Sequence, residues 1–473
     1  MFTVFDPELH RFAQRVLAEQ RAFDNGDLDA ETLDRLQWER LRETLRYTRE
    51  RSPFYRERLA QLCEDDMAEL DRDTFSSLPF TTKEDLRRHQ FGILSRPVED
   101  AWVFYETTGT TGAATPCPRD NRDSIVNNIA LTVCYDTILR EHGDRHVAAV
   151  MGPSELHSTG DTFGEVFRNL GHTVVKMWPH SPVVGFHRAL TLLDTLGVTV
   201  LVCTPGTAIA LAKHAARQGI DLPRDLGVRV ILAVGELATP SMLDNLGGLW
   251  GARVYNCMYA SQEASILAAC RADGLLHTVP LNNYYEVVDP HTSAAVHRVD
   301  GERQGELVVT SLYQGSKPLI RYRTGDLVRV ADPVAGSSYP SATLRPLGRI
   351  RDVLTLAGRE ITAYEIEDAI FRRVRTVLDY QVLIDERAGR DVLTVRLETV
   401  RGAGPGPAQL SALVTGIDAE LGVEAQVRLE KVDAISSTGA MVSWKAARIH
   451  DRRSGAGPER QAALAIAGQR AAP

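Results

Sequence analysis

A run of hydroxyls and glycines between Thr107 and Thr115 is the stretch of this 473-residue chain best suited to chemistry. It reads Thr-Thr-Gly-Thr-Thr-Gly-Ala-Ala-Thr and follows the apolar, β-favouring run 101–105. Its glycines can take positive φ, and its N–H and hydroxyl groups can point at phosphate oxygens. The residues expected to contact phosphate are Thr107, Thr108, Gly109, Thr110, Thr111 and Gly112. The Gly-Lys-Ser/Thr ending of a P-loop is absent, and alone this composition also suits a plain flexible connection.

Short apolar runs alternate with helix-length stretches between about residues 145 and 260. The runs are 147–151, 173–177, 199–202, 228–234 and 253–256. This alternation predicts buried parallel strands in a layered α/β domain. Ligands bind at the carboxyl ends of such strands. Those ends carry 152–154, 204–206, 235–236 and 259–263, each of which also suits an ordinary turn.

The rest of the chain predicts a helical start and a β-rich second half. Trp38, Leu41, Leu45 and Thr48 recur at helical spacing. Thr81 and Glu84 have the spacing of a capping box. Alternating positions in 284–288 and 305–310 predict a more antiparallel β subdomain. We therefore expect an α/β fold with domains 1–347 and 348–453, the second small and α+β, and a tail 454–473 without a packed face.

Composition excludes several classes of protein. A net charge of -8 and the lack of a Lys- and Arg-dense stretch argue against a nucleic-acid partner. The N-terminus lacks the pattern of a signal peptide and no apolar run reaches membrane-spanning length, so we expect a cytoplasmic protein with no membrane partner. The six cysteines are scattered. Cys257, Cys270 and His277 allow part of a metal site, but buried free thiols are the favoured reading.

The order of these motifs resembles the adenylate-forming superfamily of acyl-CoA synthetases, adenylation domains and luciferases, most closely its phenylacetate-CoA ligase branch. The resemblance spans residues 35 to 448. The motifs that carry it are 35–59 with Tyr47 and 50–55, then 78–83, the Thr107 loop, 235–236, 259–263, 322–326, 348–349 and 445–448.

The resemblance implies an enzyme that uses ATP and Mg²⁺ to activate a carboxylic acid, with CoA as the default acceptor. Glu263 would coordinate Mg²⁺, Asp326 would bind the ribose, and Arg349 would meet ribose or phosphate near the hinge of a mobile C-terminal domain. Lys445 would bridge the acyl carboxylate and the α-phosphate. The residues implied around the nucleotide are Gly235, Glu236, Tyr259, Ala260, Ser261 and Asp326. Those implied around the acid are Tyr105, His157, Gly160 and Val234, and Gly358 would line the thiol's path.

Five of these roles have a simpler alternative in the residues themselves. Asp326 also suits a turn cap, Lys445 a solvated basic face, Glu236 an ordinary loop carboxylate and Gly358 a β-turn. His157 also suits a residue that satisfies loop carbonyls.

The sequence departs from the family pattern at several positions. Ala113 and Ala114 stand where relatives often carry Lys-Pro, so a cation expected near the phosphates is missing, and Arg119 is a candidate replacement. Gln262 replaces Ser or Thr, Ala260 replaces Gly, and Arg351 replaces Asp or Lys.

The acceptor in the second step stays open. CoA, an amine and the pantetheine of a separate carrier protein all suit the motifs. The motifs are also compatible with a homodimer. For the acid, the resemblance favours an aryl, arylacetic or other compact carboxylate. A degenerate member that binds a nucleotide without turnover is a further alternative.

Overall fold

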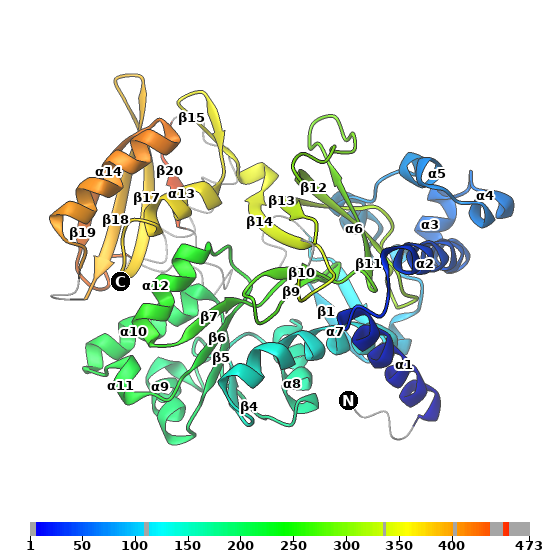
Figure 1. Cartoon of the computed structure of the whole chain (residues 1–473), viewed down its shortest axis with the longest axis horizontal. Helices are drawn as coiled ribbons and strands as arrows, with labels where there is room; N and C mark the ends of the chain where they lie inside the picture. Colours follow the sequence, from blue (N-terminus) through cyan, green and yellow to red (C-terminus); the bar gives the residue numbers. More distant parts are fainter. Residues whose placement is uncertain (1–5, 108–112, 334–336, 401–403, 436–447, 454–473) are drawn as a thin grey trace. The chain divides into compact units, whose positions relative to one another are not determined.

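The computed structural model describes residues 6–107, 113–333, 337–400, 404–435 and 448–453 (Figure 1). The chain divides into two compact units. The first comprises Met1–Arg145, Pro153–Thr173 and Cys257–Pro346, and the second comprises His146–Gly152, Val174–Asn256 and Leu347–Pro473. The predicted domain boundary at 347/348 stays a prediction, and the predicted tail lies outside the described residues.

The first unit begins with helices whose apolar faces follow the predicted spacing. In α2, Trp38, Leu41 and Leu45 are buried, which confirms the amphipathic pattern. Asp29 caps the start of α2 by accepting the Thr32 N–H at 2.8 Å. The helices of this unit are α1 (Pro7–Asp24), α2 (Ala30–Arg51), α3 (Pro53–Arg58), α4 (Glu64–Ala68), α5 (Arg72–Ser77), α6 (Lys83–His89), α7 (Asn121–Leu139) and α8 (Thr159–Asn169), with short 3-10 turns η1 (Gln90–Ile93), η2 (Val98–Asp100) and η3 (Arg140–His142).

The capping box of α6 lies one residue later than predicted. Thr82 and Asp85 form it, because the Thr82 hydroxyl accepts the Asp85 N–H and the Asp85 carboxylate accepts the Thr82 N–H. The hydroxyl of Thr81 instead donates to the carbonyl of Ile320 at 2.7 Å. The prediction of Thr81 with Glu84 was therefore wrong, since a tertiary contact already occupies Thr81.

A seven-stranded sheet forms the β-rich part of the first unit. Its order is β11-β12-β13-β14-β10-β9-β8. β11 and β12 pair antiparallel, which confirms the predicted antiparallel subdomain. Its strands are β8 (Met258–Ser261), β9 (Ser265–Cys270), β10 (Leu276–Thr278), β11 (Asn283–Val288), β12 (Glu302–Ser311), β13 (Tyr322–Ala331) and β14 (Thr343–Arg349), the last of which leads into the second unit; a separate pair is β1 (Val103–Glu106) and β2 (Pro116–Arg119).

The second unit contains the predicted parallel sheet. Its order is β4-β3-β5-β6-β7, and the β3–β5, β5–β6 and β6–β7 pairs are parallel. Figure 1 shows α9, α10 and α12 gathered on one side of it. The elements are β3 (Val147–Val150), β4 (Thr173–Lys176), α9 (Gly185–Thr195), β5 (Val200–Cys203), α10 (Pro205–Gln218), α11 (Leu222–Asp225), β6 (Val230–Ala233), α12 (Pro240–Trp250) and β7 (Arg253–Asn256).

The C-terminal part of the second unit adds a four-stranded sheet and shares an apolar core with the parallel sheet. The sheet order is β19-β18-β17-β20, and the core runs from Ala149 to Ala425 along the sequence. Both α10 and α12 contribute to this core. The elements are η4 (Ile350–Asp352), β15 (Leu354–Leu356), β16 (Arg359–Ile361), α13 (Ala363–Phe371), β17 (Val377–Arg387), β18 (Arg390–Thr399), α14 (Pro407–Leu421), β19 (Glu424–Glu430) and β20 (Ile449–Asp451).

A buried ion cluster ties α10 to the C-terminal sheet. The Lys213 ammonium lies 2.6 Å from Oδ2 of Asp379 and 2.7 Å from Oε2 of Glu398, and all three side chains are at most 5% exposed. Arg448 forms a second ion pair with Asp379. Removing one partner from such a cluster leaves a buried charge without compensation, so these contacts hold the two parts of the unit together.

The cysteines are free thiols, as predicted. Cys63 is exposed at the N-cap of α4, and the other cysteines are buried. Cys257 and Cys270 are both 0% exposed. Within the described ranges, no group of three or more His, Cys, Asp or Glu side chains is placed to hold a metal ion. The metal-site alternative for Cys257 and Cys270 therefore has no support in this part of the chain.

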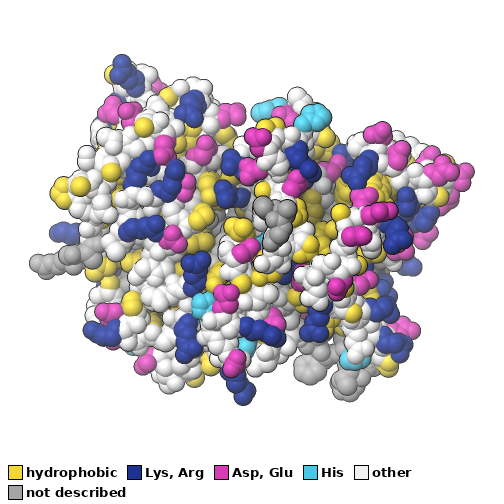
Figure 2. Space-filling view, in the orientation of Figure 1, with side chains coloured by type: hydrophobic (Ala, Val, Ile, Leu, Met, Phe, Trp, Pro, Cys, Tyr) yellow, Lys and Arg dark blue, Asp and Glu magenta, His cyan; other side chains and the backbone are white. Residues whose placement is uncertain are grey.

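Charged side chains of both signs are interspersed on the face of the molecule shown in Figure 2. Among the described helices, none combines the length and the apolar character needed to cross a membrane.

Candidate functional site

The threonine- and glycine-rich stretch is the connection of a β-hairpin in the first unit. β1 pairs antiparallel with β2, and Glu106 lies opposite Pro116. The Thr107 N–H donates to the Thr115 carbonyl at 3.1 Å, and the Thr115 N–H donates to Oγ1 of Thr107 at 2.9 Å. The base of the connection is therefore closed by its own threonines. The predicted phosphate contacts Thr108, Gly109, Thr110, Thr111 and Gly112 lie outside the described residues.

Glu263 lies in the turn between β8 and β9. The Ser261 hydroxyl accepts the Ala264 N–H at 3.0 Å, and Ser265 has φ of 63°, so the turn is tight. The Glu263 side chain is 6% exposed and lies 2.9 Å from the Lys83 ammonium. Burial raises the pKa of Glu263, but the charge and hydrogen bond of Lys83, helped by Lys317, outweigh burial and lower it overall. The carboxylate is therefore ionised at neutral pH.

The sequence motif 78–83 ends at Lys83 but predicts no binding or catalytic role for it. It is the first residue of α6, where the Thr82–Asp85 capping box fixes the start of the helix. Its spacing from Glu263 in the sequence gives no sign of the ion pair. The one sequence signal for Lys83 was a basic residue at the start of a short, N-capped helix.

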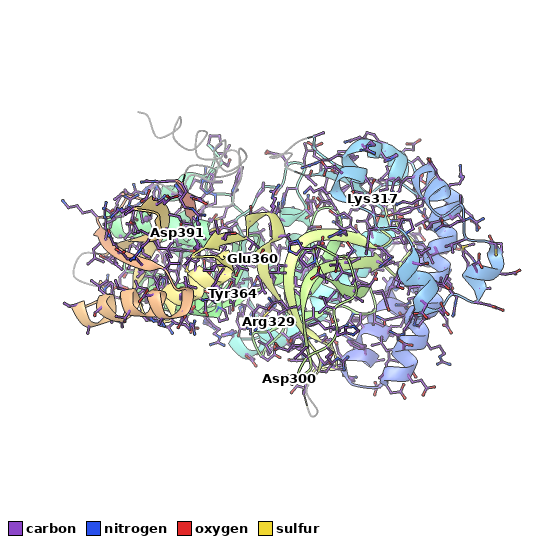
Figure 3. All side chains as sticks on the ribbon, turned by 90° about the horizontal axis from the view of Figure 1, so that it is seen from above. Asp300, Lys317, Arg329, Glu360, Tyr364 and Asp391 are labelled. Atoms are coloured by element: carbon purple, nitrogen blue, oxygen red, sulfur yellow. The ribbon has the colours of Figure 1, made fainter. Side chains whose placement is uncertain are left out.

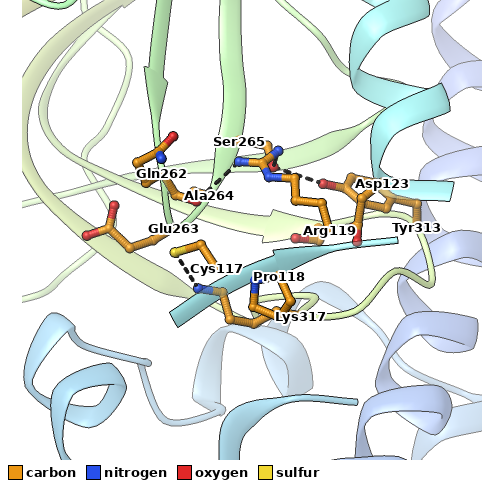
Figure 4. Close-up of a pocket in the computed structure, with 11 residues that line it drawn as sticks. Cys117, Pro118, Arg119, Asp123, Gln262, Glu263, Ala264, Ser265, Tyr313 and Lys317 are labelled. Atoms are coloured by element: carbon orange, nitrogen blue, oxygen red, sulfur yellow. Dashed lines mark hydrogen bonds between the residues drawn. The ribbon is translucent and has the colours of Figure 1, made fainter. Parts of the chain in front are cut away.

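A pocket beside Glu263 collects charged and polar side chains (Figure 4). Arg119 donates to the Gln262 carbonyl at 3.2 Å and to the Ser265 hydroxyl, so it holds the turn that carries Glu263. Gln262, which replaces the Ser or Thr of the family pattern, accepts a hydrogen bond at Oε1 from the Ser158 hydroxyl at 2.6 Å. The lining residues are Cys117, Pro118, Arg119, Asp123, Gln262, Glu263, Ala264, Ser265, Ser311, Tyr313 and Lys317.

The structure brings together two residues predicted to bind the nucleotide. The Tyr259 hydroxyl donates to Oδ2 of Asp326 at 2.6 Å. Burial, the charge of Asp326 and this hydrogen bond raise the pKa of Tyr259 well above its usual value, so the phenol stays protonated. Asp326 follows the Thr324 turn in β13, and Thr324 Oγ1 accepts the Asp326 N–H at 3.2 Å. Of the neighbouring predicted residues, Ala260 is exposed and Ser261 is half-buried.

The predicted acid-binding residues of the first unit lie around the start of α8. Tyr105 is 4% exposed and donates to Oδ2 of Asp161 at 3.2 Å. Burial raises the pKa of Tyr105, and the Asp161 charge adds to it. His157 Nδ1 lies 2.9 Å from the Thr159 hydroxyl, which agrees with a residue that satisfies its own loop. A Cβ on Gly160 would lie 2.1 Å from Oγ of Ser154, so this position is crowded.

Three predicted residues follow β6 in the second unit. Val234 is 5% exposed and belongs to the core. Gly235 has φ of 85°, a backbone conformation that favours glycine. Glu236 accepts the Gly206 N–H at 3.1 Å, at the N-terminus of α10, so this carboxylate also has a structural role.

Gly358 forms the two-residue turn between β15 and β16. Ala357 and Gly358 have φ of 48° and 77°, which is the pattern of a type I′ hairpin turn. Asp391 at the start of β18, labelled in Figure 3, accepts the Ala357 N–H at 2.8 Å. The turn thus requires a glycine, and the role of Gly358 in a thiol path stays a prediction.

Two further predicted catalytic residues are Arg349 and Lys445. Arg349 is exposed at the end of β14. Lys445 lies outside the described residues. Their roles in the reaction stay predictions.

A magnesium ion fits the chemistry of this site through one protein carboxylate. Mg²⁺ usually binds one or two carboxylates together with substrate phosphates and water, rather than a cage of protein ligands. Glu263 offers an ionised, buried carboxylate oxygen, which suits such an ion. Mg²⁺ would compete there with the Lys83 ammonium.

Comparison with solved structures shows the class of fold. The structure of 2-hydroxyisobutyryl-CoA ligase in the postadenylation state, in complex with 2-HIB-AMP, matches with a TM-score of 0.75 at 23% sequence identity. The match covers 93% of this chain and 92% of that one. The protein therefore has the acyl-CoA ligase fold, as the resemblance implied.

Sequence comparison then gives the family. The model of the AMP-binding enzyme family matches residues 48–314, so the chain belongs to this family of adenylate-forming enzymes. The phenylacetate-coenzyme A ligase of Aromatoleum evansii is 28% identical over 453 residues, covering 90% of this chain and 98% of the relative. The phenylacetate-coenzyme A ligase of Pseudomonas putida is 26% identical, covering 94% and 99%.

Proposed function

We propose that this protein is an ATP-dependent ligase that converts an aryl or arylacetic acid into its CoA thioester through an acyl-adenylate. Relatives named phenylacetate-coenzyme A ligase align over nearly their whole length, which supports this acid class. The observation that carries the proposal is the ionised Glu263, which faces Lys83 beside the hairpin of Thr107 and Thr115. A magnesium–triphosphate group needs cations near its phosphate oxygens and a carboxylate as a ligand of the metal ion.

The first step forms a bond between an acid oxygen and the α-phosphorus of ATP. The bond from that phosphorus to the β-phosphate bridging oxygen breaks, and pyrophosphate leaves with the electron pair. Lys83 and the hydroxyls of the Thr107 loop meet the charge on the phosphates, and Asp326 with Tyr259 fixes the nucleoside. Glu263 would hold the magnesium ion, which would supply further positive charge to the phosphates. Arg349 and Lys445 act at the α-phosphate. The long, flexible ammonium side chain of Lys445 suits a contact that is made only during this step.

The second step transfers the acyl group to a thiol. The CoA sulfur attacks the acyl carbon, AMP leaves from that carbon, and the thiol proton passes to solvent. The hairpin turn at Gly358 borders the path of the pantetheine arm. On the acid side, Tyr105, His157 and Gly160 of the first unit contact the ring of the substrate, and the role of Val234 in the second unit stays a separate prediction.

The test is pyrophosphate release from ATP and Mg²⁺ over a panel of aryl, arylacetic and small alkyl acids. Each acid is run without acceptor, with CoA and with simple amines. We expect release that depends on an aryl or arylacetic acid and thioester formation that depends on CoA. Turnover only with amines would replace the thioester step by an amide-forming step. ATP binding without release for any acid would indicate a nucleotide-binding module without turnover.

A further inference from the structure

Lys317 is a buried lysine at the foot of the hairpin that carries the threonine-rich connection. The residue is 8% exposed and lies between β12 and β13. Its ammonium donates to the Pro116 carbonyl at 2.8 Å. It also donates to Sγ of Cys117 at 3.1 Å, as Figure 4 shows. Pro116 directly follows Thr115, which closes the base of the connection. A lysine is seldom this buried unless a partner charge or a function keeps it there.

Neither of these acceptors is an anion. Burial raises the pKa of the Cys117 thiol, so it is neutral at pH 7, and a backbone carbonyl carries no net charge. The charge of Lys317 lowers the pKa of Glu263, but that carboxylate already forms its ion pair with Lys83 at 2.9 Å. Among these residues, two ammonium groups therefore face one carboxylate.

The wider pocket does not reverse this balance. Arg119 adds a third cation, and its hydrogen bonds go to a carbonyl and a hydroxyl. Asp123 adds a carboxylate whose Oδ2 accepts the Asp120 and Ser316 N–H groups at 2.9 Å. The charged lining residues are balanced, with Lys317 and Arg119 against Glu263 and Asp123, and the Lys83 ammonium, 2.9 Å from Glu263, leaves one positive charge in excess. Lys317 is the buried cation of this group, and an excess of positive charge around it favours an anionic ligand.

We propose that Lys317 supplies the cation that the threonine-rich loop lacks, and that it contacts the triphosphate of ATP and then the departing pyrophosphate. This inference rests on the proposed function. Relatives often carry lysine where this chain has Ala113, and the Lys317 ammonium beside Pro116, three residues further along, meets the same need. As pyrophosphate leaves, negative charge grows on its oxygens, and a positioned cation in a water-poor pocket stabilises that charge.

The alternative is that Lys317 only fastens the 311–320 segment to β2 through Pro116. If Lys317 is purely structural, its substitution should lower stability. Restoring a cation at another position should then not reverse the effect of the substitution. The two readings therefore separate on charge.

The experiment compares Lys317→Met, Lys317→Gln, Lys317→Arg and the double variant Lys317→Met with Ala113→Lys. Acid-dependent exchange of labelled pyrophosphate into ATP gives kcat and the KM values for ATP and for the acid. Calorimetry gives the affinity for pyrophosphate, and thermal melting reports on folding. Lys317→Gln keeps a donor for Pro116 without the charge, so it remains informative if Lys317→Met does not fold.

We expect the neutral variants to lose roughly 100-fold in exchange kcat/KM for ATP and about 10-fold in pyrophosphate affinity, with the KM for the acid unchanged. Lys317→Arg and the double variant should recover most of the loss. Wild-type values for ATP and pyrophosphate in folded neutral variants would overturn the inference, as would a loss that neither added cation repairs.

The proposed function and this inference fail separately. If the wild-type protein shows no acid-dependent exchange, the proposed function fails, and pyrophosphate affinity alone decides the inference. Equal affinity of the wild type and Lys317→Gln for pyrophosphate would then contradict it, and weaker binding by Lys317→Gln would support it.

Discussion

The hydroxyl of Tyr259 donates to Oδ2 of Asp326 across 2.6 Å, so two residues 67 positions apart form one polar unit. We predict that Tyr259→Phe raises the KM for ATP about 10-fold, because a hydrogen bond to a charged group contributes about 1.5–3 kcal/mol. Steady-state kinetics at varied ATP checks this. The matched control is Tyr285→Phe on the same sheet, whose hydroxyl donates to the Leu267 carbonyl and should affect stability alone. An unchanged KM in Tyr259→Phe would remove this pair from nucleotide binding.

Removing Lys83 should change the pH profile as well as the rate. Lys83 lowers the pKa of Glu263, so in Lys83→Met the carboxylate takes up its proton at a higher pH. We predict a loss of about 10-fold or more in pyrophosphate exchange and a shift of the acidic limb of the rate profile to higher pH. Arg88→Met, an exposed residue of the same helix, is the control. An acidic limb at the wild-type position would show that Glu263 does not govern it.

The buried cluster around Lys213 should dominate the stability of the second unit. Lys213→Met leaves Asp379 and Glu398 without their shared cation, and we predict a loss of about 3–5 kcal/mol in the free energy of unfolding. Arg217→Met on the same helix breaks an exposed pair with Asp433 and should cost less than about 1 kcal/mol. Urea unfolding measures both. Similar losses of unfolding free energy in the two variants would show that the buried cluster stabilises the protein no more than an exposed ion pair does.

His180 should make the protein less stable in mild acid. Burial and the nearby His214 lower the pKa of His180 to about 4, whereas an unfolded chain keeps a value near 6.5. Between these values the unfolded state binds the proton and the folded state does not, so stability falls as the pH drops from about 6.5 towards 4.

His180→Gln should therefore narrow the difference in unfolding free energy between about pH 7.5 and pH 5. His187→Gln, an exposed neighbour that bonds to Gln218, is the control and should leave that difference unchanged. An equal pH dependence in wild type and His180→Gln would contradict the assignment to this imidazole.

Much of the architecture follows from local patterns in the sequence. Nearly uninterrupted apolar runs such as 147–151 and 228–234 became β3 and β6, because strands buried on both faces leave little room for polar residues. The helical spacing of Trp38 and Leu41 gave the buried face of α2. The capping box at Thr82 was misplaced by one residue because the contact of Thr81 with Ile320 spans 239 positions.

The site was harder to predict for the same reason. Motif order pointed to Glu263, Tyr259 and Asp326, but Lys83 and Lys317 reach the neighbourhood of Glu263 from distant segments. Neither the charge of a lysine nor its spacing reveals such a partner. The union of 174–256 with the C-terminal segment in one unit likewise depends on tertiary contacts such as those of Lys213.

The exposed thiol of Cys63 offers a chemical handle on the first unit. The other five cysteines are buried, and burial raises the pKa of Cys117, Cys134, Cys257 and Cys270. Since the thiolate is the species that reacts, an alkylating dye at neutral pH should modify Cys63 ahead of the rest. A fluorophore at the N-cap of α4 would thus label the native protein at one position, without any engineered substitution.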